Sequence, residues 1–313
     1  MSTSNNFNDT LASLFVGESR IPEEFRIEEL HQREYLVNGE MRKWDGAVSE
    51  VYSPNMIPTS EGLKRKLIGS YPIGTGVEAN EALESAIAAY DNGRGEWPSM
   101  SVQERVKCLE KFVYKMGEQR TLVVNLIMWE IGKSYADSAK EFDRTVEYIN
   151  NTIDALKDID RQSSRFEIKE GVVAQVRRTP LGVVLCMGPF NYPLNETYTT
   201  LIPAILMGNT ILFKPPKHGT LVHYPLLKAF QECFPKGVVN TVYGRGADVT
   251  PALMESGKVN VLAFIGSSKV ANDLKKRHPK INRLRAVLSL DAKNAAIVTV
   301  DADIKLAVKE CIL

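Results

Sequence analysis

The stretch from Leu181 to Pro193 decides the fold, and it reads Leu-Gly-Val-Val-Leu-Cys-Met-Gly-Pro-Phe-Asn-Tyr-Pro. Residues 182–187 are a short apolar run, which is typical of a strand that is buried on both faces. The glycine, prolines and asparagine that follow favour a turn. A helical pattern then covers residues 193–207, so this stretch predicts a strand that leads through a tight loop into a helix.

The same alternation continues along the rest of the chain. We predict further strands at residues 210–213, 238–242, 259–265, 285–290 and 295–299. We predict further helices at residues 220–234, 247–256, 269–277 and 301–311. Buried strands that alternate with helices form a parallel sheet covered on both faces, so the predicted fold class is α/β with a doubly wound, Rossmann-like sheet.

The part of the chain before residue 181 is predicted to be mainly helical. A short helix near residues 22–32 and several extended segments come first, followed by helices at 77–91, 101–117, 121–131 and 134–159. Ser101 and Glu104 form a capping box at the start of the 101–117 helix, and Gly132 ends the helix after it. Alternating apolar and charged residues around Gly171 predict an inserted β-hairpin within residues 165–178.

Composition and charge exclude several classes of function. The 313 residues are 44% hydrophobic and 25% charged with a net charge of +1, which provides no strongly basic surface for nucleic acid. The longest apolar runs are too short to cross a bilayer, and residues 1–10 lack the pattern of a signal peptide, so we expect a cytoplasmic protein without membrane contact. The four cysteines contain no C-x-x-C pair, so no metal site is predicted.

The loops after the predicted strands contain residues that suit a polyphosphate ligand. Parallel sheets bind ligands at the carboxyl ends of their strands. The residues found there in this chain are Asn191, Lys214, Lys217, Gly244, Gly266 and Ser267. Each has a simpler interpretation when taken alone, because asparagine and glycine are common turn residues and most lysines are solvated. Together they predict one ligand-binding edge of the sheet.

The order of these motifs resembles the aldehyde dehydrogenase superfamily. The resemblance rests on the 181–193 stretch, on Lys214-Pro-Pro216 and on Phe264-Ile-Gly-Ser267, and it covers roughly residues 35–313. It is closest to the NADP-dependent, non-phosphorylating glyceraldehyde-3-phosphate dehydrogenase branch. In this family a cysteine attacks the aldehyde, hydride passes to the nicotinamide, and water hydrolyses the thioester.

The resemblance implies roles for several residues at the ligand-binding edge. Asn191 matches the asparagine whose amide stabilises the oxyanion. Gly244 matches a glycine that lets the adenine approach closely. Gly266 and Ser267 match residues beside the pyrophosphate, at a helix start where backbone N–H groups favour anions.

The resemblance also implies that NADP is favoured over NAD. Lys214 matches the lysine that contacts the adenosine ribose. Lys217 stands three positions later, where NAD-preferring members often carry an acidic residue, and a lysine attracts the 2′-phosphate that a carboxylate would repel. Arg144 resembles the arginine that binds the substrate phosphate in the glyceraldehyde-3-phosphate branch. The alternative is a surface arginine paired with Glu147.

The chain departs from the family pattern at two points. Ser289 stands where the family has its general-base glutamate, and Asp291, on the same face of a strand, is a candidate for a displaced carboxylate or for a structural role. The nucleophilic cysteine of the family lies beyond Leu313, so it is absent from this chain. Cys186 and Cys311 are expected to pack in the core instead.

We therefore divide the chain into four parts, of which the NADP-binding domain is made of two separate stretches. Residues 1–34 are an N-terminal extension, 35–162 and 181–292 the NADP-binding domain, 163–180 an oligomerisation hairpin, and 293–313 the start of an incomplete, truncated catalytic domain. The full-length protein would oxidise a small aldehyde, glyceraldehyde 3-phosphate to 3-phosphoglycerate, as a homodimer or homotetramer, whereas the fragment alone would be inactive. Two alternatives stay open: another aldehyde or semialdehyde as substrate, and a non-catalytic nucleotide-binding or scaffold protein derived from the family.

Overall fold

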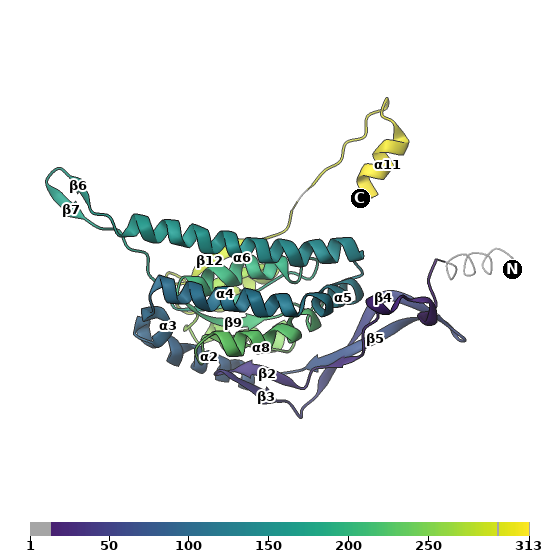
Figure 1. The fold of residues 1–313 in the computed structure, drawn as a ribbon, viewed down its shortest axis with the longest axis horizontal. Helices are drawn as coiled ribbons and strands as arrows, with labels where there is room; N and C mark the ends of the chain where they lie inside the picture. Colours follow the sequence, from purple (N-terminus) through teal and green to yellow (C-terminus); the bar gives the residue numbers. More distant parts are fainter. Residues whose placement is uncertain (1–13, 293, 313) are drawn as a thin grey trace.

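A parallel sheet forms the centre of the molecule (Figure 1). The computed structural model describes residues 14–292 and 294–312. Within them, the sheet has the strand order β10-β9-β8-β11-β12, and every neighbouring pair is parallel. The bounds are β8 Val183–Met187, β9 Thr210–Lys214, β10 Val239–Thr241, β11 Val261–Ile265 and β12 Arg285–Ser289. The predicted doubly wound sheet is therefore confirmed.

Helices cover both faces of this sheet, as its buried apolar strands require. On one face α2 packs on β8, β9 and β10, α9 lies beside α2, and α10 lies beside α9. On the other face α7 contacts β8, β9 and β11, while α4 and α6 pack on the outside of α7. The bounds of these helices are α2 Gly76–Tyr90, α4 Val102–Glu118, α6 Tyr135–Ser163, α7 Asn195–Leu206, α9 Gly246–Glu255 and α10 Ser268–Arg277.

Local sequence signals set several helix boundaries. Ser101 Oγ accepts from the N–H of Glu104 at 3.2 Å, and the Glu104 carboxylate accepts from the N–H of Ser101 at 3.1 Å, so the predicted capping box starts α4. Gly132 ends α5 with a left-handed φ of 81°. The remaining helical elements are η3 Asp91–Gly93, α3 Glu96–Ser99, α5 Arg120–Ile131, η4 Leu221–His223 and α8 Tyr224–Cys233.

The amino-terminal part is mostly strand. β4 (Val48–Thr59) and β5 (Gly62–Pro72) form a long antiparallel hairpin, and β2 (Glu34–Val37) pairs with β3 (Glu40–Lys43). The β2 strand lies against β10, at the edge of the central sheet. These strands are the extended segments that the sequence predicts before residue 77.

The helix predicted near residues 22–32 is wrong. Its second half is β1 (Leu30–His31), which pairs in parallel with β5, and its first half contains only a short 3₁₀ turn. Gly69 permits this pairing, because a Cβ there would lie 2.1 Å from the carbonyl oxygen of Leu30. A tertiary strand contact therefore overrides the local pattern. The two 3₁₀ turns of this region are η1 Glu18–Arg20 and η2 Glu23–Phe25.

The predicted inserted hairpin is present. β6 (Glu167–Lys169) pairs antiparallel with β7 (Val172–Ala174) around Glu170 and Gly171, which both have positive φ. The hairpin extends away from the body of the molecule beyond the end of α6 (Figure 1), and every residue in its strands is exposed.

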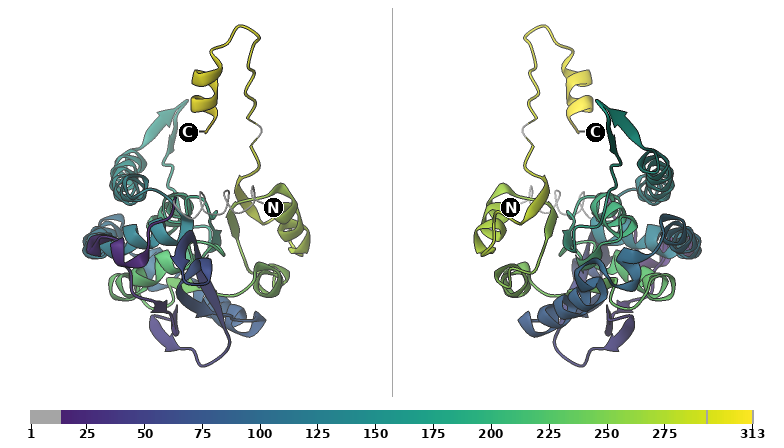
Figure 2. Two further views of the ribbon diagram at one scale, coloured as in Figure 1. Left: turned by 90° about the vertical axis from the view of Figure 1, so that its right-hand side faces the viewer. Right: turned by 90° about the vertical axis from the view of Figure 1, so that its left-hand side faces the viewer.

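The carboxyl-terminal residues differ from the prediction. No strand forms at 295–299, because this stretch has no neighbouring strand to pair with in the described chain. An irregular segment leads instead to α11 (Ile304–Ile312), which lies away from the sheet (Figure 2). Cys311 is exposed rather than packed in the core, since nothing in the described chain covers α11. Cys186 is buried in β8, as expected.

Among the described residues, no helix combines the length and the apolar character that crossing a membrane requires.

Candidate functional site

The loops after β8 and β11 meet where the strand order of the sheet reverses. β8 has β9 on one side and β11 on the other, so the chain winds in opposite directions from this point. Open α/β sheets bind their ligands at the carboxyl edge beside such a reversal. The fold brings Asn191, in the loop after β8, and Ser267, in the loop after β11, to this edge. This edge is the candidate ligand site.

Lys214 is the last residue of β9 and is almost fully buried. The residue is 7% exposed, and its Nζ donates to the carbonyl oxygen of Pro215 at 3.2 Å. Burial lowers the pKa of this lysine to about 8. Gly246, the first residue of α9, lies beside it, because a Cβ at Gly246 would be 3.9 Å from Lys214 Cε. A buried ammonium group next to a helix amino terminus is suited to hold an anion.

Lys217 and Gly244 lie in the adjoining loops. Lys217 is exposed three residues after Lys214. Gly244 follows β10 with a φ of 121°, which favours glycine. A Cβ there would lie 2.4 Å from the carbonyl oxygen of Gly74. The fold itself therefore requires glycine at this position, independently of any ligand.

The amino terminus of α10 brings together three of the predicted residues. Ser267 is its N-cap residue, and the N–H of Gly266 donates to the carbonyl oxygen of Ser289 at 3.0 Å. Asp291 Oδ2 accepts from the N–H of Ser268 at 2.9 Å. The Asp291 carboxylate thus accepts from one donor of this helix start.

Arg144 lies on the exposed side of α6. It lines a surface cavity together with Lys140, Asp143 and Glu147. Asp143 is bound by Arg120 at 2.7 Å, and in the described part of the chain Arg144 forms no ion pair with Glu147. The surface pairing considered as the alternative is therefore not formed in this structure.

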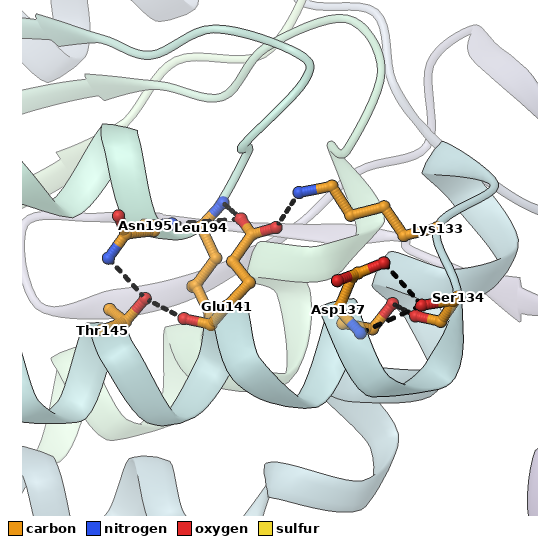
Figure 3. A network of polar contacts seen from close by, with 8 residues as sticks. Lys133, Ser134, Asp137, Glu141, Thr145, Leu194 and Asn195 are labelled. Atoms are coloured by element: carbon orange, nitrogen blue, oxygen red, sulfur yellow. Dashed lines mark hydrogen bonds and ion pairs between the residues drawn. The ribbon is translucent and has the colours of Figure 1, made fainter. Parts of the chain in front are cut away.

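A buried carboxylate on α6 anchors the loop that carries Asn191 (Figure 3). Glu141 Oε1 accepts from the N–H groups of Leu194 at 3.0 Å and Asn195 at 3.2 Å, at the start of α7. Its Oε2 accepts from Lys133 Nζ at 2.5 Å, and the Glu141 side chain has no exposed surface. The carboxylate therefore serves as the amino-terminal cap that the α7 sequence does not supply itself.

Two further contacts hold the same loop. Asn195 Nδ2 donates to Thr145 Oγ1 at 3.3 Å, so α6 contacts the start of α7 a second time (Figure 3). Lys133 Nζ also lies 3.4 Å from the centroid of the Tyr192 ring, within the range of a cation–π contact. The residues that follow Asn191 in the loop are consequently held by groups from the α5–α6 region.

A second buried glutamate holds the loop after β9. Glu130, on α5, accepts from the N–H groups of Thr220 at 2.8 Å and Leu221 at 3.1 Å. Burial raises the pKa of this carboxyl to about 7. The sequence pattern predicted a role for neither Glu130 nor Glu141. The available signal was the place of Glu130 in an otherwise apolar helix, where a charged residue requires a partner.

Comparison with known proteins decides the family. Residues 51–313 match the family model described as the aldehyde dehydrogenase family. The chain belongs to this family. It is 31% identical over 287 residues to the NADP-dependent glyceraldehyde-3-phosphate dehydrogenase of Streptococcus equinus, which covers 90% of this chain and 57% of that protein. It is 30% identical over 245 residues to malonate-semialdehyde dehydrogenase 1 of Bacillus thuringiensis subsp. konkukian, covering 78% and 49% of the two chains.

Solved structures agree on the aldehyde dehydrogenase fold. The NADP-dependent glyceraldehyde-3-phosphate dehydrogenase from Bacillus halodurans C-125, complexed with NADP, is 28% identical and superposes with a TM-score of 0.73. The match covers 90% of this chain and 57% of that one. This chain therefore spans about half the length of the relatives it matches, and the predicted resemblance is confirmed for the family and the fold.

The structure also gives the positions of two residues that the sequence analysis compared with the family's catalytic groups. Ser289 ends β12, opposite Ile265, at the position predicted for the general base. Cys186 has its pKa raised to about 12 by burial, which makes it unsuited to act as a nucleophile. Within the described residues, no group of histidine, cysteine, aspartate or glutamate side chains could hold a metal ion.

Proposed function

We propose that this chain forms the NADP-binding part of an aldehyde dehydrogenase that oxidises a small phosphorylated aldehyde to a carboxylic acid. The observation that carries the proposal is the arrangement of Lys214 and Lys217. The first is a buried cation beside the start of α9, and the second is an exposed cation in the same loop. Two cations and a helix amino terminus suit the 2′-phosphate of NADP. The proposed cofactor domain comprises residues 35–162 and 181–292.

The other residues of the carboxyl edge have complementary roles in this proposal. NADP, when bound, supplies the hydride acceptor. Gly266 and Ser267 bring the start of α10 beside its pyrophosphate, where the positive end of the helix dipole favours an anion. Asn191 directs its side-chain amide at the oxygen of the aldehyde as that oxygen becomes anionic, and the loss of one such donor typically costs about 3 kcal/mol. The cap formed by Glu141 keeps the Asn191 loop in place.

Calorimetric titration of the folded 313-residue chain with NADP and with NAD tests the cofactor. NADP should bind more tightly, and Lys217→Glu should weaken NADP binding about tenfold while it changes NAD binding little. Lys309→Glu, which alters the net charge equally on the exposed helix α11, is the matched control. A folded chain that binds neither dinucleotide would favour the non-catalytic scaffold alternative.

For the substrate, we propose glyceraldehyde 3-phosphate, because Arg144 lacks an ion-pair partner among the described residues and a relative of that activity matches the chain. A semialdehyde is the second candidate, since another relative is a malonate-semialdehyde dehydrogenase. Arg144→Gln should weaken binding of 3-phosphoglycerate about tenfold and leave binding of glycerate unchanged, measured by calorimetry on the same chain. Equal effects on both ligands would contradict the phosphate role of Arg144.

A further inference from the structure

A basic cavity lies at the edge of the sheet opposite to the candidate ligand site. Val183 and Asn260, at the amino ends of β8 and β11, contribute to its wall. Lys258, Lys280 and Arg283, from the loops after α9 and α10, line it as well. Its volume is about 220 Å³. The full length of the strands separates this cavity from the carboxyl edge, so a ligand at one edge does not occupy the other.

The charge of this cavity is of one sign. No aspartate or glutamate lines it, and its three cations form no ion pair within the described residues. The acidic residues at the neighbouring helix ends are engaged elsewhere. Glu255 and Asp273 each bind Arg277 at 2.8 Å, and Asp91 binds Arg94 at 3.0 Å. The three cations of the cavity are thus exposed and form no ion pair in the part of the chain that the structure describes.

The preference of helix carboxyl ends for cations does not explain why Lys280 and Arg283 lie here. The last turn of α10 already carries Lys275, Lys276 and Arg277. The effect of the helix dipole fades beyond the last turn, whereas Lys280 and Arg283 lie in the connection to β12. Like charges gathered around a concave surface repel one another, and an anion bound between them would relieve that repulsion.

Hydrogen bonds fix the polar groups of the cavity. Asn260 Oδ1 accepts from the N–H of Val183 at 2.9 Å, which leaves its Nδ2 as a donor without a partner in the described chain. The buried His278 contacts the carbonyl oxygen of Val259 through Nε2 at 3.0 Å, and its Nδ1 accepts from the N–H of Lys280 at 3.2 Å. The backbone that carries Lys280 is therefore held in place before any ligand arrives.

We propose that this cavity binds a phosphate group, either free or carried by a small metabolite. Three cations and one amide donor match the charge and the acceptor oxygens of phosphate. The volume is below the roughly 300–1,000 Å³ of sites for larger ligands, so the occupant is a compact anion rather than a dinucleotide. The proposal does not depend on the proposed function, because no residue of the carboxyl edge takes part.

Calorimetric titration of the 313-residue chain with inorganic phosphate and with glycerol 3-phosphate, at constant ionic strength, tests the proposal. Saturable binding should be weakened about tenfold or more by Lys280→Glu with Arg283→Glu, and also by Lys258→Glu alone. Lys275→Glu with Lys276→Glu changes the net charge of the same helix region equally and should have little effect. Tighter binding of glycerol 3-phosphate than of inorganic phosphate would identify a metabolite as the occupant, and equal binding would identify free phosphate.

Three results would overturn the proposal. The first is the absence of saturable binding by the folded chain. The second is equal weakening in the site and control variants, which would indicate non-specific attraction. The third is loss of phosphate binding in Lys217→Glu with retention in the Lys280 and Arg283 variant, which would place the phosphate at the cofactor edge.

Discussion

At the scale of single residues, Lys214 is a cation whose charge depends on pH near neutrality. Its pKa is lowered to about 8 by burial, so the ammonium form dominates only below that pH. The 2′-phosphate of NADP, with a second pKa of about 6, keeps a constant charge above pH 7. NADP affinity should therefore fall as pH rises through about 8, by up to tenfold per pH unit. Calorimetry between about pH 7 and pH 9.5 would measure this.

The matched variant for this prediction is Lys214→Arg. A guanidinium stays charged over the whole range, so the variant should bind NADP with little dependence on pH. If NADP affinity falls with pH in Lys214→Arg as it does in the natural chain, Lys214 is not the group responsible.

The free energy of unfolding of the natural chain should change with pH in the opposite direction to NADP affinity. Because the pKa of Lys214 in the folded chain lies below the unfolded value of 10.5, the unfolded chain binds more protons between the two values, and the free energy of unfolding rises with pH there.

At the scale of elements, the loop that carries Asn191 depends on a carboxylate supplied by a different helix. Glu141→Ala should lower the free energy of unfolding by about 3–5 kcal/mol, because it leaves Lys133 and two N–H groups of α7 without their buried partner. Urea denaturation measures this loss. Thr152→Ala, elsewhere on α6, removes only a hydroxyl that bonds to its own helix and is the control.

A double-mutant cycle separates the ion pair from the cap. Lys133→Met combined with Glu141→Ala should cost less than the sum of the single changes, since the second change no longer strands a buried charge. Additive costs would mean that the two side chains act independently, contrary to their 2.5 Å contact.

The elements also show what sequence alone could predict. The apolar runs of β8 and β11 and the Ser101–Glu104 capping box are local signals, and the structure confirms them. The caps made by Glu141 and Glu130 join residues 53 and 90 positions apart, so no local pattern predicts them. The strand predicted at 295–299 is absent from the structure for a related, non-local reason. An apolar run becomes a strand only where another strand can pair with it.

At the scale of the whole molecule, two segments present apolar side chains away from the body. In the hairpin, Ile168 and Val173 form a cross-strand pair and are 75% and 62% exposed. On α11, Ile304 and Val308 are 60% and 50% exposed. The hairpin differs from α11 because its edges also carry strand N–H and C=O groups that can pair with a second copy. We therefore propose the hairpin, rather than α11, as the surface through which copies of this chain associate.

Sedimentation velocity over a range of concentrations tests this choice of surface. Ile168→Lys with Val173→Lys should weaken self-association by about 100-fold, because lysines of both copies would face one another in the contact. Ile304→Lys with Val308→Lys adds the same charge to α11 and should leave association through the hairpin intact. If only the α11 variant becomes monomeric, the copies associate through the exposed apolar side chains of α11 and not through the strand edges of the hairpin. The hairpin would then have no part in assembling this chain.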